Sequence, residues 1–154
     1  MTGTPKQTDV ETRTYLHNLD YSKVKALIID ADLECGAVEL PEGLVALDGD
    51  VLVGYIGYHI KYKGNAHIDM LVVDKDYRRS GVGTLLIRDA AYQMKTVGVS
   101  QFSSEVELDN QNGIVLYSKL GAVLTPKLSM TEDVNRVHLA ASHLVLEHSS
   151  LKTS

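Results

Sequence analysis

The chain of 154 residues has one cysteine, no tryptophan and a net charge of −5. The lone Cys35 has no partner for an internal disulfide, so we expect no crosslinks and a location in the reducing cytoplasm. No apolar run approaches the roughly 20 residues that a membrane-spanning helix needs. The amino-terminal stretch also lacks the apolar segment of a signal peptide. These absences predict a soluble cytoplasmic protein with no membrane partner.

Positive charge is also scarce. Fifteen Lys and Arg residues stand against twenty Asp and Glu residues, and the one adjacent basic pair is Arg78-Arg79. Nucleic-acid binding needs clustered cations that neutralise phosphates, so we expect no nucleic-acid partner. His138, His143 and His148 have no carboxylate or cysteine partner at ligand spacing, so we expect no metal site.

The chain is expected to form a single domain over residues 13–148. No repeat, low-complexity linker or shift in composition divides this stretch. Residues 1–12 and 149–154 are polar and are expected to be loose tails.

The first half of the chain predicts a helix and two hairpins. A helix is predicted over residues 20–32, capped by Asp20 or Ser22, because apolar residues share one face: Val24, Leu27, Ile28 and Leu33. Asp48-Gly49-Asp50 and Lys63-Gly64-Asn65 separate apolar runs, and such glycine-containing breaks are typical of hairpin turns. Three antiparallel strands are therefore predicted, over residues 44–47, 51–60 and 66–73.

The pattern changes period after residue 73. An apolar stripe from Val82 to Val97 predicts a helix that ends at Gly98. Residues 102–108 are predicted as a strand, residues 112–120 as a short helix, and the tail contains β-prone pieces over 122–128 and 143–146. Strands followed by alternating helix and strand indicate an α/β or α+β fold with a mixed sheet.

The most informative segment joins the strand that ends at residue 73 to the next helix. Gly81 and Gly83 let backbone N–H groups converge on an anion, and the helix adds its free N–H groups and its dipole. Arg78 or Arg79 and the hydroxyls of Ser80 and Thr84 can supplement those bonds. The pattern is neither a P-loop nor a dinucleotide fingerprint, and on its own a plain helix start remains an equal alternative.

Two motifs at their proper separation resemble the GNAT family of N-acetyltransferases. Arg78-Arg79-Ser80-Gly81-Val82-Gly83 is similar to the family's Arg/Gln-x-x-Gly-x-Gly/Ala core. Asn110, Tyr117 and Gly121 match its Asn-x-x-Ala-x-x-x-Tyr-x-x-x-Gly-Phe motif, in which Gly113 and Ala122 replace the usual Ala and Phe. The resemblance runs from about Leu44 to Ala122. It implies a central mixed, mostly antiparallel sheet of about six to seven strands flanked by helices.

The resemblance also implies acetyl-coenzyme A as co-substrate. Its pyrophosphate would lie on residues 79–84 beside Arg78, and its pantetheine would run along residues 71–73. Asn110 would contact the pantetheine arm, with capping of the following helix as an equal alternative. The implied cofactor-binding residues are Leu71, Val72, Val73, Arg78, Arg79, Ser80, Gly81, Val82, Gly83, Thr84 and Asn110.

Acetyl transfer to an amine needs a base for the amine proton and an acid for the thiolate. The resemblance places Tyr117 near the thioester sulfur as the acid, with packing in the core as the alternative. Relatives that draw the base from the preceding strand have it four or six residues before the position of Val73, which gives Asp69 and His67. A water-exposed polar face is the alternative for both residues, and Glu105 and Glu107 are reserve candidates.

Strand alternation bears on these candidates. A period of two places His67 and Asp69 on one face of their strand, with Ile68 and Met70 on the other. Histidine suits a base because its ordinary pKa lies near neutrality. On the preceding strand, His59 lies among tyrosines, and we interpret this run as an aromatic sheet face: Tyr55, Tyr58 and Tyr62.

The implied function is an N-acetyltransferase. It would move the acetyl group of acetyl-coenzyme A onto a primary amine of a small molecule or a protein, by direct attack in a ternary complex. Cys35 lies outside both motifs, which gives an acetyl-cysteine intermediate little support. The alternatives are a catalytically silent acyl-coenzyme A-binding regulatory protein and an interaction protein that uses the fold without a cofactor. A second copy of the chain, in a homodimer, is a further candidate partner.

Overall fold

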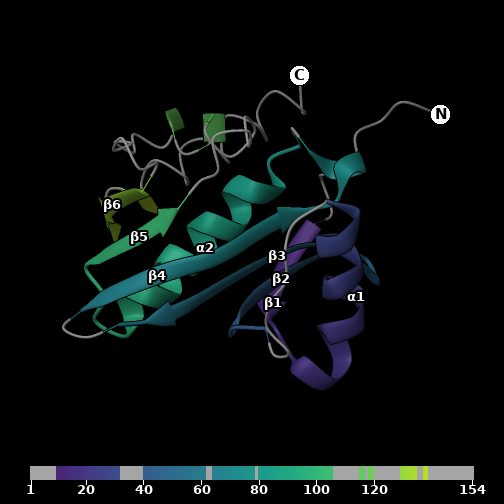
Figure 1. Ribbon diagram of the computed structural model, residues 1–154, viewed down its shortest axis with the longest axis horizontal. Helices are drawn as coiled ribbons and strands as arrows, with labels where there is room; N and C mark the ends of the chain where they lie inside the picture. The colour runs from purple at the N-terminus through teal and green to yellow at the C-terminus, as the bar shows by residue number, and fades with distance from the viewer. Residues whose placement is uncertain are drawn as a thin grey trace.

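A computed structural model describes residues 10–31, 40–61, 64–78, 80–105, 115–116, 118–119, 129–134 and 137–138. Within these residues, six strands form one sheet in sequence order (Figure 1). Neighbouring strands are antiparallel except for the parallel pair β4–β5. The strands are β1 (Val10–Thr14), β2 (Gly43–Asp48), β3 (Val51–Ile60), β4 (Asn65–Val73), β5 (Gln101–Glu105) and β6 (Ser129–Asp133). The expected mixed, mostly antiparallel sheet is confirmed.

Two helices pack on the sheet, and Figure 1 shows β1–β3 between them. They are α1 (His17–Asp30) and α2 (Val82–Thr96). A buried cluster around Leu86, Met94 and Phe102 fills the α2 side, and a second cluster around Ile28 and Tyr55 fills the α1 side. In the described part of the chain, no helix is long and apolar enough to cross a membrane.

The predicted turns and the second helix are confirmed. Gly49 and Gly64 have φ of 62° and 76°, and they lie in the two hairpin turns that connect β2 to β3 and β3 to β4. Gly98, with a φ of 86°, follows the end of α2. Val97, expected in the buried stripe, is 66% exposed because the helix ends at Thr96.

The amino-terminal boundary of the domain needs a correction. Residues 10–12, expected in a loose tail, belong to β1 and pair with β2. Thr12 donates a hydrogen bond from its hydroxyl to Oδ2 of Asp89 in α2, at 2.6 Å. The strand has one strongly apolar residue, Val10, because it lies at the sheet edge and has one neighbouring strand in the described sheet. The pattern of apolar residues therefore does not predict β1.

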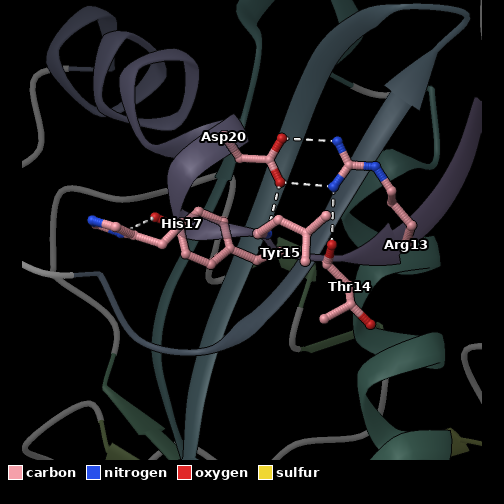
Figure 2. A network of polar contacts seen from close by, with 6 residues as sticks. Arg13, Thr14, Tyr15, His17 and Asp20 are labelled. Atoms are coloured by element: carbon pink, nitrogen blue, oxygen red, sulfur yellow. Dashed lines mark hydrogen bonds and ion pairs between the residues drawn. The ribbon is translucent and has the colours of Figure 1, made fainter.

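The first helix starts earlier than predicted. α1 begins at His17, and Asp20 lies inside its first turns rather than at its cap. Oδ2 of Asp20 accepts a hydrogen bond from the backbone N–H of Leu16 at 2.8 Å. Arg13 of β1 binds both carboxylate oxygens of Asp20, at 2.7 and 2.8 Å (Figure 2). These bonds join β1 to α1 and hold the pKa of Asp20 below its ordinary value.

The carboxyl-terminal part of the sheet differs from the prediction. β6 lies between the two tail pieces predicted as strands, in a polar stretch without a strand pattern. The tail pieces over 122–128 and 143–146 fall outside the described residues. The helix predicted over 112–120 is described only at residues 115–116 and 118–119, which are helical.

Candidate active site

The predicted strand–turn–helix is confirmed. β4 is followed by the short helix η2 (Lys75–Tyr77) and then by the turn that starts α2. Gly81 is the residue at the N-terminal cap of α2 and has a φ of 88°, a conformation that glycine adopts at little cost. The N–H of Leu85 donates to the carbonyl of Gly81 at 2.9 Å, which closes the first turn. The first N–H groups of α2 therefore remain unpaired within the helix.

The second glycine lies at a close contact between three segments. A Cβ at Gly83 would lie 3.1 Å from Cδ2 of Leu116 and 3.8 Å from Cγ2 of Val73. Leu116 also packs against the cluster on the α2 side. Because Leu116 directly precedes Tyr117, the fold brings the chain around the second motif to the first motif. Tyr117 itself, Arg79 and Asn110 lie outside the described residues.

Tyr77 anchors the turn from outside it. Its backbone carbonyl accepts hydrogen bonds from the N–H and the hydroxyl of Ser80. Its own hydroxyl donates to Oδ2 of Asp48 at 2.6 Å, and this hydrogen bond, together with burial, raises the pKa of Tyr77 to about 12. Sequence reasoning missed this residue, although its place directly before Arg78 was an available signal. Arg78 donates from Nε to the carbonyl of Val73 at 3.3 Å, which ties its side chain to the end of β4.

β4 contains a bulge at Asp69. Tyr58 of β3 pairs with Ile68, and the next residue toward the amino terminus of β3, Gly57, pairs with Met70. Asp69 is therefore an extra residue without a register partner in β3. Such a bulge locally bends a strand and shifts the alternation of its side chains.

The bulge overturns part of the predicted alternation. Ile68, Leu71 and Val73 pack with the cluster on the α2 side, whereas Met70 and Val72 pack with the cluster on the α1 side. The prediction that Ile68 and Met70 share a face is therefore wrong. An extra residue between them reverses the faces of the positions that follow.

Among the described residues, β4 has an open edge beyond the bulge, on the side of β5. The parallel pairs between β4 and β5 run from Asn65↔Gln101 to Ile68↔Ser104. Among the described residues, no strand pairs with residues 69–73 on the side of β5. An unpaired strand edge of this kind offers backbone N–H and C=O groups to an extended ligand.

His67 and Asp69 both contact the ring of His59. Nδ1 of His59 lies 2.8 Å from Oδ2 of Asp69, and the rings of His59 and His67 have their centroids 5.7 Å apart. Nδ1 of His67 lies 2.8 Å from Oγ of Ser103 on β5. The prediction that His67 and Asp69 share a face is confirmed.

The interpretation of one aromatic sheet face is wrong. Tyr58 packs against the cluster on the α2 side, whereas Tyr55 belongs to the cluster on the α1 side, and Tyr62 lies outside the described residues. Tyr55 is fully buried in the cluster on the α1 side, as packing requires. His59 is instead opposite His67 in the hairpin register. With His67, Asp69 and Ser103 it forms a group that we call the polar cluster. The hairpin turn and the strand lengths were the signal that could have placed it there. Of the reserve candidates, Glu107 lies outside the described residues, and Glu105 is described only in its backbone at the end of β5.

The polar cluster is not arranged as a metal centre. Within the described ranges, no group of three His, Cys, Asp or Glu side chains is placed to hold a metal ion.

Comparison with known proteins gives a family match. The model of the acetyltransferase (GNAT) family matches residues 11–122. A human protein named N-alpha-acetyltransferase 30 is 35% identical to this chain in an alignment of 88 residues that covers 54% of this chain and 24% of the human protein. The chain thus spans about a quarter of the length of this relative.

Solved structures share the fold. Ard1 from Thermoplasma volcanium has a TM-score of 0.73 and 22% identity, over 82% of this chain and 98% of that one. A PaiA N-acetyltransferase from Thermoplasma acidophilum, solved in complex with coenzyme A, has a TM-score of 0.56 and 22% identity, over 75% and 74% of the two chains. The fold of this chain therefore recurs in proteins of low sequence identity.

Proposed function

The chain belongs to the acetyltransferase (GNAT) family, and on this premise we propose that it transfers the acetyl group of acetyl-coenzyme A to a free α-amine at the amino terminus of a protein or peptide. The observation that carries the proposal is the glycine turn at the start of α2, directly beside the open edge of β4. The choice of an α-amine is supported by the human relative, which is named an N-alpha-acetyltransferase. We place this activity in one domain that begins with β1.

The glycine turn suits the pyrophosphate of the co-substrate. The positive end of α2 and its first N–H groups attract an anion. Gly81 and Gly83 keep side chains out of the turn, and Arg78, tied to the end of β4, adds positive charge. The residues proposed to hold this part of the molecule are Arg78, Arg79, Ser80, Gly81, Val82, Gly83 and Thr84.

The open edge of β4 suits the pantetheine arm. This arm contains amide groups, which can pair with the backbone of Leu71, Val72 and Val73 as an added strand would. From Val73 to the bulge at Asp69 an extended strand covers about 13 Å. The acetyl group would therefore lie near the bulge when the pyrophosphate lies on the turn. We propose that Asn110 contacts the same arm.

The polar cluster and the second motif supply the proton chemistry. An α-ammonium group has an ordinary pKa of about 8, so it must lose a proton before it attacks the thioester. His67 and Asp69 stand with His59 beside the bulge, where a base is needed. We propose that Tyr117 protonates the departing thiolate, because Leu116 brings that part of the chain to Gly83 and Val73.

A screen of amine classes tests the proposal. The purified chain is incubated with acetyl-coenzyme A and with peptides that have a free α-amine, with polyamines and aminoglycosides, or with α-blocked peptides that have a free lysine. Free thiol is then measured. The proposal predicts thiol release with the α-amine peptides. Thermal stabilisation by acetyl-coenzyme A without thiol release from any amine would instead support a silent acyl-coenzyme A-binding protein.

A further inference from the structure

We propose that His59 is the general base of this site and that Asp69 positions it. The inference rests on the proposed transferase function and assigns a catalytic role to a residue on β3 that neither motif contains. Its basis is the 2.8 Å contact between Nδ1 of His59 and Oδ2 of Asp69. The side chains are 50% and 29% exposed, so the pair is open to a substrate and still partly shielded from water.

The bulge in β4 makes this contact available. Asp69 is the extra residue of the bulge, and it lies just beyond the last pair between β4 and β5, Ile68↔Ser104. The His59–Asp69 pair therefore lies where the pairing of β4 with β5 ends in the described part of the chain. The pantetheine arm reaches that place when it follows residues 73 to 71 from the glycine turn.

The carboxylate determines which ring nitrogen can act as a base. An ionised carboxylate only accepts hydrogen bonds, so Nδ1 of His59 carries the hydrogen and Nε2 carries the lone pair. Among the described residues, none hydrogen-bonds to Nε2 of His59. The same division of roles, a base oriented by a carboxylate on its other nitrogen, is found in hydrolase triads.

His67 makes a different contact from His59. Its Nδ1 faces the hydroxyl of Ser103, which can both donate and accept, so this contact does not determine the tautomer of the ring. The centroids of the His67 and His59 rings lie 5.7 Å apart, so His67 lies beside the proposed base. Among the described residues, the titratable groups that contact the ring of His59 are His67 and Asp69, both on β4.

The α-ammonium group of the acceptor gives one proton to Nε2 of His59, which passes it to solvent. The amine nitrogen then forms a bond to the acetyl carbon of acetyl-coenzyme A, and the carbon–sulfur bond breaks. The nitrogen releases its second proton, and the coenzyme A thiolate takes up one proton, so the net products are the acetylated amine, free thiol and one proton.

Steady-state kinetics across pH test the assignment, with acetyl-coenzyme A and a peptide that has a free α-amine. His59→Gln should lower kcat/KM for the peptide on the order of 10²–10⁴-fold near neutral pH, the usual contribution of a general base. The loss should shrink as pH rises, because hydroxide and free amine replace the base. Asp69→Asn should keep the base but move the acid limb of the pH–rate profile. The KM for acetyl-coenzyme A should stay unchanged in both variants, and His138→Gln is the matched control outside the site.

Chemical rescue separates a base from a packing residue. Free imidazole should restore turnover to His59→Ala and should have no effect on the wild-type chain. A wild-type pH profile in His59→Gln, or loss of the acid limb in His67→Gln alone, would overturn the assignment of His59. If the wild-type chain binds acetyl-coenzyme A but acetylates no amine, the proposed function fails and the base assignment fails with it.

Discussion

The hydroxyl of Tyr77 donates a hydrogen bond to Oδ2 of Asp48 at 2.6 Å, and this bond joins the turn before α2 to the end of β2. Because the carbonyl of Tyr77 accepts two hydrogen bonds from Ser80, the same residue holds the glycine turn and the hairpin together. Tyr77 thus ties the turn proposed to bind pyrophosphate to the end of β2.

Tyr77→Phe should weaken both the fold and the turn. It removes a hydrogen bond to a carboxylate, and since Asp48 is half-buried and can be rehydrated, we expect a loss of about 1–2 kcal/mol in the free energy of unfolding. The affinity for acetyl-coenzyme A should fall several-fold. Urea unfolding and calorimetric titration measure the two effects. Tyr21→Phe, which removes a hydroxyl that accepts a hydrogen bond from Lys25, is the control and should change neither.

The same pair makes stability depend on pH in the alkaline range. The pKa of Tyr77 is raised to about 12, so its neutral form is the one the fold stabilises. The contribution of the pair is fully present below the ordinary tyrosine pKa of about 10 and is lost as pH rises from there through about 12. The difference in Tm between the wild-type chain and Tyr77→Phe should therefore narrow above pH 10. A difference that stays constant to pH 12 would contradict the role of this hydrogen bond.

Arg13→Ala should destabilise the chain by about 2–4 kcal/mol, because it leaves the buried carboxylate of Asp20 without its main partner. The pKa of Asp20 is lowered in the fold, chiefly by its hydrogen bonds to Arg13. The stabilisation is therefore present above the ordinary carboxyl pKa, near 4, and is lost as pH falls through the lowered value. Urea unfolding at neutral and acidic pH measures this. If the wild-type chain and the variant differ in their free energy of unfolding by the same amount at neutral and at acidic pH, the account is contradicted.

Gly83→Asp should separate folding from co-substrate binding. A negative charge in the first turn of α2 is favourable for the helix, and the new side chain has to displace only the flexible end of Leu116. The same charge repels a pyrophosphate, so the Kd for acetyl-coenzyme A should rise on the order of 10–100-fold. The neutral variant Gly83→Asn controls for size and should bind more tightly than Gly83→Asp. If both variants bind with wild-type affinity, the pyrophosphate lies elsewhere.

Tyr117→Phe should lower turnover without lowering affinity. The change keeps the ring and deletes the hydroxyl proposed to protonate the thiolate, so kcat should fall on the order of 10²–10⁴-fold. The Tm and the Kd for acetyl-coenzyme A should stay unchanged. Full turnover in this variant, measured as thiol release with an α-amine peptide, would show that the tyrosine is structural.

Local patterns predicted the parts of the fold that local physics determines. The hairpins could be predicted because their turns need positive φ, which Gly49 and Gly64 adopt. Helix α2 could be predicted because apolar residues recur with a helical period between residues 82 and 96. The motif spacing located the glycine turn in the same way. β1 was missed because an edge strand needs few apolar residues.

The features that the sequence did not predict depend on contacts across the sheet. The bulge at Asp69 is a shift in the register between β3 and β4, and without it the face of Met70 is assigned wrongly. The contact between His59 and Asp69 depends on the same register. The bond between Tyr77 and Asp48 joins residues 29 positions apart, which no local pattern connects.

The most direct test of the central claim is to identify the nitrogen that carries the acetyl group. Two peptides of the same sequence are incubated with the chain and acetyl-coenzyme A: one has a free α-amine and a blocked lysine, and the other has a blocked α-amine and a free lysine. The products are sequenced by mass spectrometry. The account predicts acetylation of the α-amine and none of the lysine. Acetylation of the lysine alone, or binding of acetyl-coenzyme A with neither peptide acetylated, would contradict it.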